Sequence, residues 1–373
     1  MKSNIQLKEK SGQVDFILLA LIMMLALFGF VMLFSANAPK AANGGIIRTL
    51  IKQGGNLGIG AVALLFTANY DYHKYRRYQN MIMVATIAIM GIVPVFGIVS
   101  HGATRQISLG GFLSFQPSEF AKYALVLYYA LYLSDPQTQD IEKNVKNIKK
   151  AVYVLIALCA TCLLQRHLSA MIVIVFIGAS MLIIAGLSKR VIKVGAITAG
   201  VGAALAIMFA GYRMDRIKAY LDPFKYKQGI GWQIIQSFFA VGSGGLFGLG
   251  LGQSRQKYNY LPEAQNDYIY AIVCEELGFI GGVAVMILFV CLVWRGISIA
   301  LKARDKMGMY TAFGISCIIG IQMLINIGVV LSVIPSTGMQ LPFFSSGGSS
   351  MIATMLGLGI LLNISKTSRI KKL

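Results

Sequence analysis

Residues Gly242 to Gly282 read GSGGLFGLGLGQSRQKYNYLPEAQNDYIYAIVCEELGFIGG. This stretch joins a glycine-rich turn, a basic and aromatic run, the acid-bearing segment LPEAQND and the start of an apolar helix. Placing an ionisable group next to hydrocarbon costs about 2.5 to 3.5 kcal/mol on an insertion scale, so such groups usually have a function. Asp267 is therefore the first candidate for chemistry at a membrane surface.

The composition of the whole chain is that of an integral membrane protein. Of its 373 residues, 56% are hydrophobic and 13% are charged, against about 25% charged residues in soluble domains. Apolar runs long enough to cross a bilayer as a helix recur along the chain, and they do not alternate as barrel strands would. We expect an all-α, polytopic membrane protein that forms a single domain over residues 1–373.

The apolar runs predict about ten transmembrane helices. Their expected ranges are 15–37, 47–69, 80–100, 117–134, 150–165, 168–187, 192–211, 268–294, 310–333 and 346–364. Lysines and arginines gather on one side of this pattern and are sparse in the short connections on the other side. Because positive residues favour the cytoplasm, we expect both termini there, and one long extracytoplasmic loop at about 212–267, between helices seven and eight.

This long loop is itself basic and aromatic. Its cations are Arg213, Arg216, Lys218, Lys225, Lys227, Arg255 and Lys257. Long loops can ignore the charge rule, which is one interpretation; the other is that the cations and their aromatic neighbours bind an anionic lipid headgroup. Nucleic acid is not expected as a partner. Gln228 to Val241 has the pattern of a helix lying in the membrane interface, and the glycines from Gly242 to Gly252 permit a tight re-entrant turn.

Few carboxylates are available for chemistry on the outer side. Glu119 and Lys122 are three residues apart and can pair on one helix face, either as a structural pair or as part of a catalytic site. Glu275 and Glu276 point about 100° apart around their helix, so we expect them to pack or to form hydrogen bonds, with Lys122 or Arg105 as candidate partners. Asp267 stands at the helix mouth, where it could be a base or a helix cap.

At these residues the sequence resembles the shape, elongation, division and sporulation (SEDS) family of bacterial membrane glycosyltransferases, which includes FtsW, RodA and SpoVE. The resemblance covers essentially the whole chain. Its motifs are Phe115 to Glu119 with Lys122, Gln236-Ser237 leading to Gly242 to Gly248, Leu261 to Glu263 with Asp267, Glu275 to Gly278, Asn326 to Gly328, Pro335, Gly338, Leu341 to Phe343 and Ser345 to Ser350. Val31 to Ala36 and Gly231 to Gln233 are more similar to the FtsW and SpoVE branch.

The sequence departs from the family pattern at an outer hairpin, at Gln106, where the family usually has tryptophan, and at Ser346, where it usually has tyrosine. Where the family usually reads Gln-Pro-Asp-Leu-Gly-Thr, this chain has Gln165 to Ala170 with the letters QRHLSA. No role of that aspartate carries over to this chain. The change leaves a cation and a histidine at this hairpin, which could alter substrate contacts or be local drift. His167 itself is interpreted as a structural histidine with its hydrogen bonds satisfied, with a base as the alternative.

The resemblance implies that the chain polymerises lipid II into β1,4-linked glycan strands and releases undecaprenyl pyrophosphate. Asp267 matches the family's catalytic aspartate and would act as the general base. A divalent cation such as Mg²⁺ or Mn²⁺ is a further candidate for balancing the pyrophosphate charge. The candidate substrate-binding residues are Arg105, Glu119, Lys122, Arg213, Arg216, Arg255, Lys257, Glu263, Ser345 and Ser349.

The resemblance also implies partners in the bacterial plasma membrane. A class B penicillin-binding protein would cross-link the strands and would face the eighth and ninth helices and the outer loop near Pro335 to Ser350, with other divisome or elongasome proteins nearby. Two other functions stay open. A lipid II flippase would also need polar groups inside a helical bundle, and a non-catalytic scaffold would not need Asp267 at all.

Overall fold

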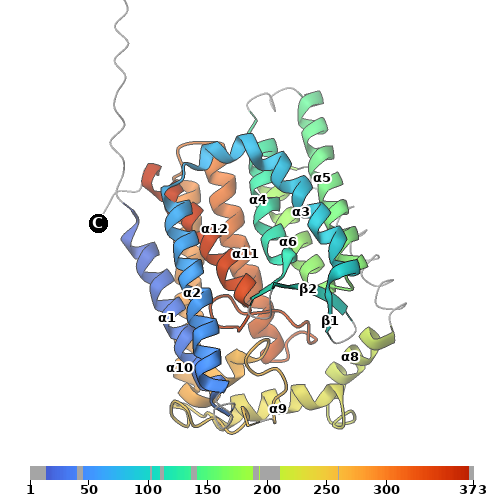
Figure 1. Ribbon diagram of the computed structural model, residues 1–373, viewed down its shortest axis with the longest axis vertical. Helices are drawn as coiled ribbons and strands as arrows, with labels where there is room; N and C mark the ends of the chain where they lie inside the picture. Colours follow the sequence, from blue (N-terminus) through green and yellow to red (C-terminus); the bar gives the residue numbers. More distant parts are fainter. Residues whose placement is uncertain are drawn as a thin grey trace, which may run out of the picture.

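The computed structural model describes residues 14–39, 45–100, 103–109, 113–135, 141–187, 193, 211–258 and 260–368. It shows a bundle of upright helices with two helices lying across its lower end (Figure 1). The helices are α1 (Phe16–Ala36), α2 (Gly45–Asn69), the 3-10 helix η2 (Tyr72–Lys74), α3 (Tyr75–Phe96), α4 (Pro117–Ser134), α5 (Ile141–Leu164), α6 (Leu168–Ile184), α8 (Gly211–Leu221), α9 (Ile230–Ser243), α10 (Ile269–Leu301), α11 (Lys306–Val330) and α12 (Gly348–Thr367).

Six helical segments of the described chain are long and apolar enough to cross a membrane. They are Phe16–Ala36, Tyr72–Phe96, Lys146–Leu164, Ile269–Leu301, Lys306–Val330 and Gly348–Thr367. The shorter apolar helix α6 and the more polar α2 and α4 coincide with three further expected spans. Most of the expected span at 192–211 lies outside the described residues. The protein is therefore a mainly helical, multi-pass membrane protein.

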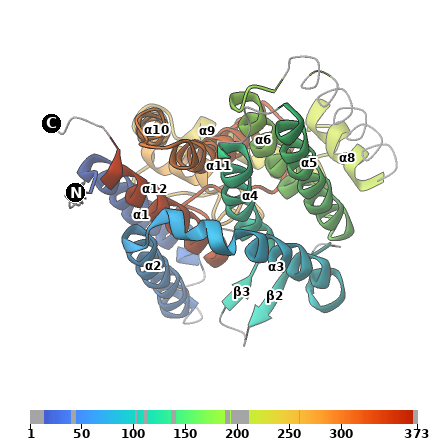
Figure 2. The ribbon, with the colours of Figure 1, turned by 90° about the horizontal axis from the view of Figure 1, so that it is seen from above.

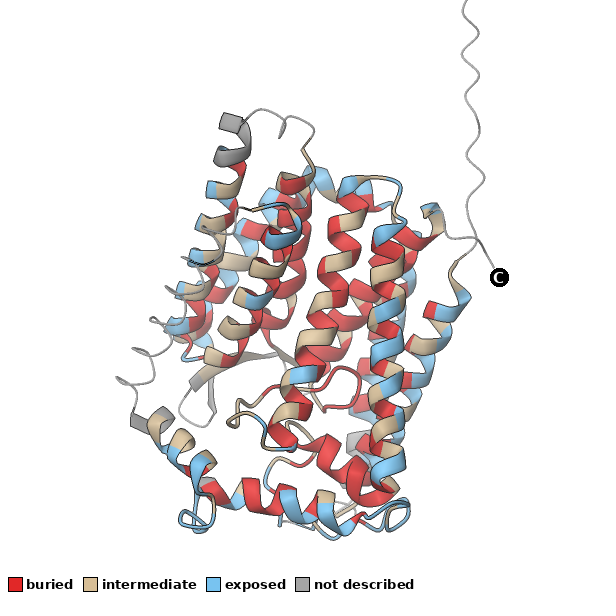
Figure 3. Ribbon diagram, turned by 180° about the vertical axis from the view of Figure 1, so that it is seen from behind, coloured by how far each residue is buried: buried red, intermediate tan, exposed pale blue. Residues whose placement is uncertain are grey.

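The centre of the bundle is formed by helices that are buried on nearly all sides. Figure 2 shows α4 near the middle, and it packs against α3, α6, α11 and α12. In the most apolar 18 residues of α12, 89% of the residues are buried inside the protein. The corresponding shares are 39% in α1 and 28% in α10. Figure 3 shows the same contrast, with buried residues in the central helices and exposed residues on the outer ones. The outer helices therefore present the apolar surface suited to lipid.

A small antiparallel sheet between α3 and α4 corrects the expectation of an all-α chain. Its strands are β1 (Ile98–Ser100), β2 (Ala103–Leu109) and β3 (Leu113–Phe115), in the order β1-β2-β3. Ile107 of β2 pairs with Phe115 of β3. β1 falls at the end of the span expected at 80–100, and the rest of the segment lies outside the apolar runs. The segment is rich in polar, β-branched and glycine residues, which favour a short hairpin over a helix. Arg105 is carried on β2.

Of the two helices at the lower end, α9 matches the interfacial segment expected at Gln228 to Val241. In Figure 1, α8 and α9 run across the ends of the upright helices. The side chain of Trp232 on α9 donates to the Tyr260 carbonyl at 2.8 Å, and that of Gln233 donates to the Pro262 carbonyl at 3.1 Å. These bonds tie α9 to the loop that leads to Asp267.

The glycine-rich turn packs main chain to main chain against a break in α10. Gly278 has φ +68° inside this helix, a conformation that glycine adopts without strain. The amides of Leu249 and Gly250 donate to the carbonyls of Glu275 and Glu276 at 3.0 and 2.9 Å. A Cβ on Gly278 would lie 2.3 Å from the Gly248 nitrogen. The turn thus satisfies backbone groups that the broken helix leaves open, as membrane-embedded irregular backbone requires.

Candidate functional site

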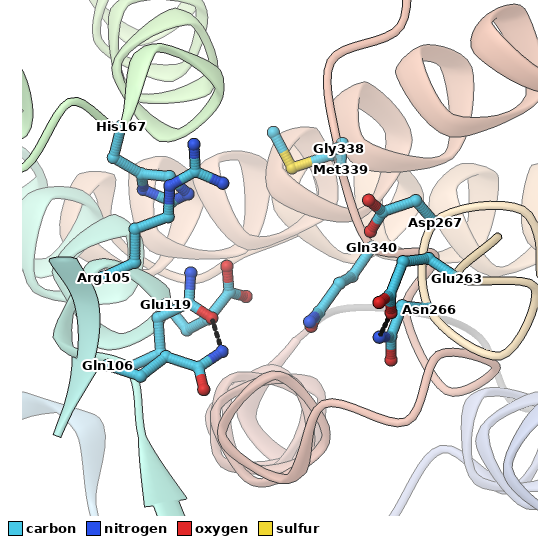
Figure 4. Close-up of a pocket in the computed structure, with 11 residues that line it drawn as sticks. Arg105, Gln106, Glu119, His167, Glu263, Asn266, Asp267, Gly338, Met339 and Gln340 are labelled. Carbon is cyan, nitrogen blue, oxygen red and sulfur yellow. Dashed lines mark hydrogen bonds between the residues drawn. The ribbon is translucent and has the colours of Figure 1, made fainter. Parts of the chain in front are cut away.

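A polar cavity of about 360 Å³ opens between the β-sheet and the loop before α10 (Figure 4). One wall comes from β2, the start of α4 and the start of α6, and the other comes from the segments just before α10 and after α11. The lining residues are Arg105, Gln106, Gln116, Glu119, His167, Glu263, Asn266, Asp267, Gly338, Met339 and Gln340. Four of the residues proposed from the sequence therefore share one cavity: Arg105, Glu119, Glu263 and Asp267.

Asp267 lies on the wall opposite Arg105 and His167, and its carboxylate faces the cavity in Figure 4. The N-cap of α10 is Tyr268, without a side-chain capping bond, so Asp267 does not occupy the cap position that was the alternative for it. The side-chain amide of Asn326 on α11 donates to the Asp267 carbonyl at 2.8 Å and to the Met339 carbonyl at 2.7 Å. One buried amide thus fixes the backbone on both sides of the carboxylate.

The loop that carries Asp267 is held by the segment before α12. The hydroxyl of Ser345 donates to the Asn266 carbonyl at 2.6 Å, and the Ser346 amide donates to the Gln265 carbonyl at 3.0 Å. Ser346 also hydrogen-bonds the Asn266 side chain. Glu263 has φ +54°, an uncommon conformation for a residue with a side chain. The loop is therefore built to a defined shape before substrate arrives.

Glu119 and Lys122 form an ion pair on the first turns of α4. Lys122 Nζ lies 2.7 Å from Glu119 Oε2, and their side chains are 1% and 7% exposed. Glu119 also lines the cavity, so the pair belongs to both the helix core and the site. A buried charge that loses its partner is strongly destabilising. The pair therefore supplies a fixed dipole beside the cavity, in keeping with either interpretation made from the sequence.

The buried acids of α10 have different partners from those expected. Lys257 Nζ lies 2.9 Å from Glu276 Oε1 with both side chains 0% exposed, and Ser35 of α1 donates to Glu276 at 2.7 Å. Glu275 accepts from the Ser254 hydroxyl and from the Arg255 amide at 2.9 Å. These acids bind the 254–257 segment, so the pairing expected with Lys122 or Arg105 is wrong. Local helix geometry could not show that one loop wraps past both acids.

Several expected substrate ligands take part in the framework instead. Lys257 is sealed in the pair with Glu276, which corrects its expected contact with a headgroup. Ser345 and Ser349 are buried, and Ser349 donates to the Ser114 carbonyl at 2.7 Å, so these hydroxyls hold backbone and do not line the cavity. Ser349 thereby ties α12 to β3.

The remaining expected cations lie outside the cavity lining. Arg216 Nη1 donates to the Ser336 carbonyl at 2.9 Å, which places it beside the loop that supplies Gly338. Arg255 is exposed at the surface of its loop. The side chain of Arg213 lies outside the described part of the chain. Substrate binding by these three arginines stays a prediction.

His167 differs from the satisfied structural histidine that was one sequence-based interpretation. It is 5% exposed, it lines the cavity, and its Nδ1 has no hydrogen-bond partner. Burial, with Arg105 and Lys122 nearby, lowers the pKa of His167 to about 3. The ring is therefore neutral near pH 7 and carries one donor and one acceptor.

Sequence reasoning missed Asn266 and Gln340 as lining residues. Asn266 directly precedes Asp267, and Gln340 lies between Gly338 and Leu341 of a family-like motif. A polar side chain inside each motif was the available signal. In the described residues, no group of three or more histidine, cysteine, aspartate or glutamate side chains is arranged to hold a metal ion. Binding of Mg²⁺ or Mn²⁺ stays a prediction.

Comparison with known proteins places this architecture in one family. Residues 15–370 match the family model for FtsW, RodA and SpoVE, described as cell cycle protein. The stage V sporulation protein E of Bacillus subtilis (strain 168) is 40% identical over 96% of this chain and 99% of its own length. A probable peptidoglycan glycosyltransferase FtsW of Geobacter sp. (strain M18) is 36% identical over 95% and 97% of the two chains.

Solved structures agree with this assignment. A chain from a peptidoglycan synthase complex that coordinates polymerisation and crosslinking has a TM-score of 0.77 and 27% identity, covering 94% of this chain and 97% of its own. The rod shape determining protein RodA of Thermus thermophilus has a TM-score of 0.70 and 26% identity, covering 96% and 98%. Because the family model matches nearly the whole of this chain, the chain belongs to the FtsW, RodA and SpoVE family.

Proposed function

We propose that the chain is a peptidoglycan glycosyltransferase that polymerises lipid II into β1,4-linked glycan strands. Its family relatives are named for this activity or for sporulation. The observation that carries the proposal is the cavity in which Asp267 and Arg105 face each other from opposite walls (Figure 4). In such a cavity the carboxylate can accept a proton from the attacking hydroxyl, and the guanidinium can stabilise the negative charge of the leaving pyrophosphate.

In the proposed reaction, the Asp267 carboxylate takes the proton from the 4-hydroxyl of the acceptor sugar. The hydroxyl oxygen attacks C1 of the donor sugar, the new C–O bond forms, and the bond from C1 to the pyrophosphate oxygen breaks with its electron pair. Attack from the face opposite an α-linked pyrophosphate inverts C1 and gives the β link. Pyrophosphate leaves without a proton donor, so one carboxylate suffices where glycoside hydrolysis needs two.

The departing pyrophosphate needs positive charge. Arg105 is the cation that lines the cavity, and Lys122 is paired with the lining residue Glu119. Fixed charges in a site with little water stabilise developing charge more than they would in bulk solvent. If a divalent cation binds, Asp267 and Glu263 would be the carboxylates that hold it, and it would supply further positive charge for the pyrophosphate.

The proposed orientation has ten spans, cytoplasmic termini and the cavity on the extracytoplasmic side, in the bacterial plasma membrane. Support comes from the distribution of lysines and arginines in the sequence and from α8 and α9, which cross the cavity end of the bundle like interfacial helices (Figure 1). The loop 212–267 then delivers Asp267 to the outer surface.

We also propose a class B penicillin-binding protein as partner, within a divisome or elongasome assembly. The relative from the peptidoglycan synthase complex supports this proposal. On α10, Phe279, Ile287 and Trp294 are 64%, 55% and 73% exposed, so this helix offers an apolar face. Residues 341–345 and 348–350 are buried, which removes about half of the loop 335–350 from the expected contact surface.

Glycan synthesis from purified lipid II tests the function. Asp267→Asn should lower the rate by about 10²- to 10⁴-fold, while the control Asp215→Asn, on an acid with 57% side-chain exposure, should match wild type. Each protein is assayed with and without a cognate penicillin-binding protein whose own activity is blocked. Equal polymer from wild type and Asp267→Asn would reject Asp267 as the base and favour Glu119 or Glu263. Movement of lipid II across vesicle membranes without polymer would favour a flippase. Normal growth of cells that carry Asp267→Asn would favour a scaffold.

A further inference from the structure

His167 lines the cavity, is deeply buried and carries a buried polar atom without a partner. The side chain is 5% exposed and its Nδ1 has no hydrogen-bond partner. Figure 4 shows the ring beside Arg105 on the wall opposite Asp267. Native proteins leave few buried polar atoms unpaired, and such an atom in a site is a candidate for a ligand contact.

The backbone around His167 is fixed from three directions. Arg166 has φ +54°, so a residue with a side chain holds the left-handed conformation that turns α5 into α6. The His167 amide donates to the Cys162 carbonyl at 2.8 Å, which closes the end of α5. Ser169 hydrogen-bonds the Thr337 carbonyl, next to the cavity residue Gly338. The ring is thus placed by a strained and well-anchored turn, as preorganised sites often are.

The neighbours of His167 define what it can bind. Two cations, Arg105 and Lys122, lie close enough to act on it, and with burial they lower the pKa of the imidazole to about 3. A neutral imidazole offers one N–H donor and one nitrogen acceptor. That pair suits a sugar hydroxyl or an acetamido group. Arg105 beside it suits the pyrophosphate, so the two side chains together match a sugar that is linked to pyrophosphate.

We propose that His167 is a substrate-binding residue, which hydrogen-bonds a hydroxyl or acetamido group of the donor sugar next to the pyrophosphate held by Arg105. This inference rests on the proposed function, since it assumes a lipid-linked amino sugar in the cavity. The donor sugar then lies on the His167 wall, and the acceptor hydroxyl lies on the Asp267 wall. His167 orients the donor and takes no proton in the reaction.

Three variants separate this role from a packing role. His167→Leu fills the site without polar atoms, His167→Asn keeps a donor and an acceptor close to the position of Nδ1, and Arg166→Asn is the control. Arg166 is exposed outside the lining residues, and asparagine tolerates its left-handed backbone. The full-length proteins are compared for lipid II polymerisation, for lipid II binding and for Tm in detergent.

We expect His167→Leu to lower kcat/KM for lipid II by about tenfold, mainly through KM, and to weaken lipid II binding by a similar factor. Its Tm should equal or exceed that of wild type, because an unsatisfied buried nitrogen has been removed. His167→Asn should recover most of the binding, and Arg166→Asn should match wild type. A packing role predicts the opposite pattern, with lower Tm in both His167 variants and no recovery by asparagine.

The two proposals fail in different ways. If wild type polymerises lipid II and His167→Leu has the same KM, kcat and lipid II affinity, His167 is not a substrate ligand and the glycosyltransferase proposal stands. If wild type makes no polymer and binds no lipid II, both proposals are overturned. If wild type binds lipid II without polymerising it, weaker binding by His167→Leu still supports the contact, and equal binding overturns it.

Discussion

Lys257 Nζ lies 2.9 Å from Glu276 Oε1, and neither side chain has any exposed surface. This pair joins the loop before Asp267 to α10. Lys257 also donates to the Gly252 carbonyl at 2.7 Å and to the Ser35 hydroxyl at 3.1 Å. Three segments that are distant in sequence therefore meet at one ammonium group.

Removing one partner of this pair should destabilise the contact between the 252–257 loop and α10. Glu276→Leu leaves the Lys257 charge buried without its counter-ion, which costs about 3 to 5 kcal/mol. We expect a marked fall in Tm and loss of glycan synthesis. The double variant Lys257→Met with Glu276→Leu should recover much of the stability, since apolar residues of similar volume often replace a buried pair well. Equal Tm values for the single and double variants would show that the two charges are not coupled.

Gly278→Ala should be destabilising because both the backbone and the space require glycine. Its φ of +68° with ψ of −167° is a conformation essentially confined to glycine, and it costs about 1 to 3 kcal/mol for a residue with a Cβ. That Cβ would also lie 2.3 Å from the Gly248 nitrogen and 2.5 Å from the Leu246 carbonyl oxygen. Thermal unfolding in detergent measures the effect. Gly242→Ala is the matched control, since a Cβ there meets nothing within 4 Å, and it should leave Tm unchanged.

Gly338→Ala should reduce the activity more than the stability. Gly338 has φ +71°, and a Cβ there would lie 3.2 Å from Asp267 Oδ2. We expect the methyl group and the strained backbone to displace the carboxylate, with kcat for lipid II polymerisation falling by about tenfold or more, since small misplacements of a catalytic group are costly. Gly320→Ala on α11, where the nearest contact is 3.5 Å from Val293, should retain wild-type kcat. A wild-type kcat in Gly338→Ala would mean that Gly338 does not determine the position of the Asp267 carboxylate.

The stability of wild type should fall in mild acid in a way that depends on His167. An unfolded histidine binds a proton near pH 6.5, whereas burial with Arg105 and Lys122 nearby lowers the pKa of folded His167 to about 3. Between these values the unfolded state holds more protons, so stability is full above pH 6.5 and is lost as the pH falls. From pH 7.5 to 5.5 the loss is about 1.4 kcal/mol.

The matched comparison is His167→Leu, which lacks the titrating group and retains every other one. Its Tm should decline less steeply than that of wild type over the same pH range. Parallel declines in the two proteins would contradict the lowered pKa. Thermal unfolding at pH 7.5, 6.5 and 5.5 is sufficient for the measurement.

The parts of the fold that follow from local patterns could be predicted from the sequence. The long apolar runs gave spans that coincide with α1, α10, α11 and α12, because hydropathy alone determines what can enter lipid. The interfacial pattern of Gln228 to Val241 anticipated α9, at Ile230–Ser243. Local chemistry also singled out Asp267, since an acid at a helix mouth is unusual.

The parts that depend on distant contacts could not be predicted. Glu276 meets Lys257 and Ser35, and only the tertiary fold brings these three together. The main error about Lys257 has the same origin, because a lysine in a basic loop resembles a headgroup ligand until its buried acid is known. His167 required the cavity and its unpaired Nδ1 to be seen before it differed from an ordinary core histidine.

The contact between the glycine-rich turn and α10 is made of main-chain hydrogen bonds. The exposed side chains of the turn can therefore be substituted without loss of these bonds. Leu246 and Phe247 are 63% and 79% exposed on the same turn whose backbone binds the broken helix. Substitutions there alter the surface that lipid or a partner meets without shifting the amides and carbonyls of this contact. Related enzymes can therefore evolve different assemblies around an unchanged catalytic frame.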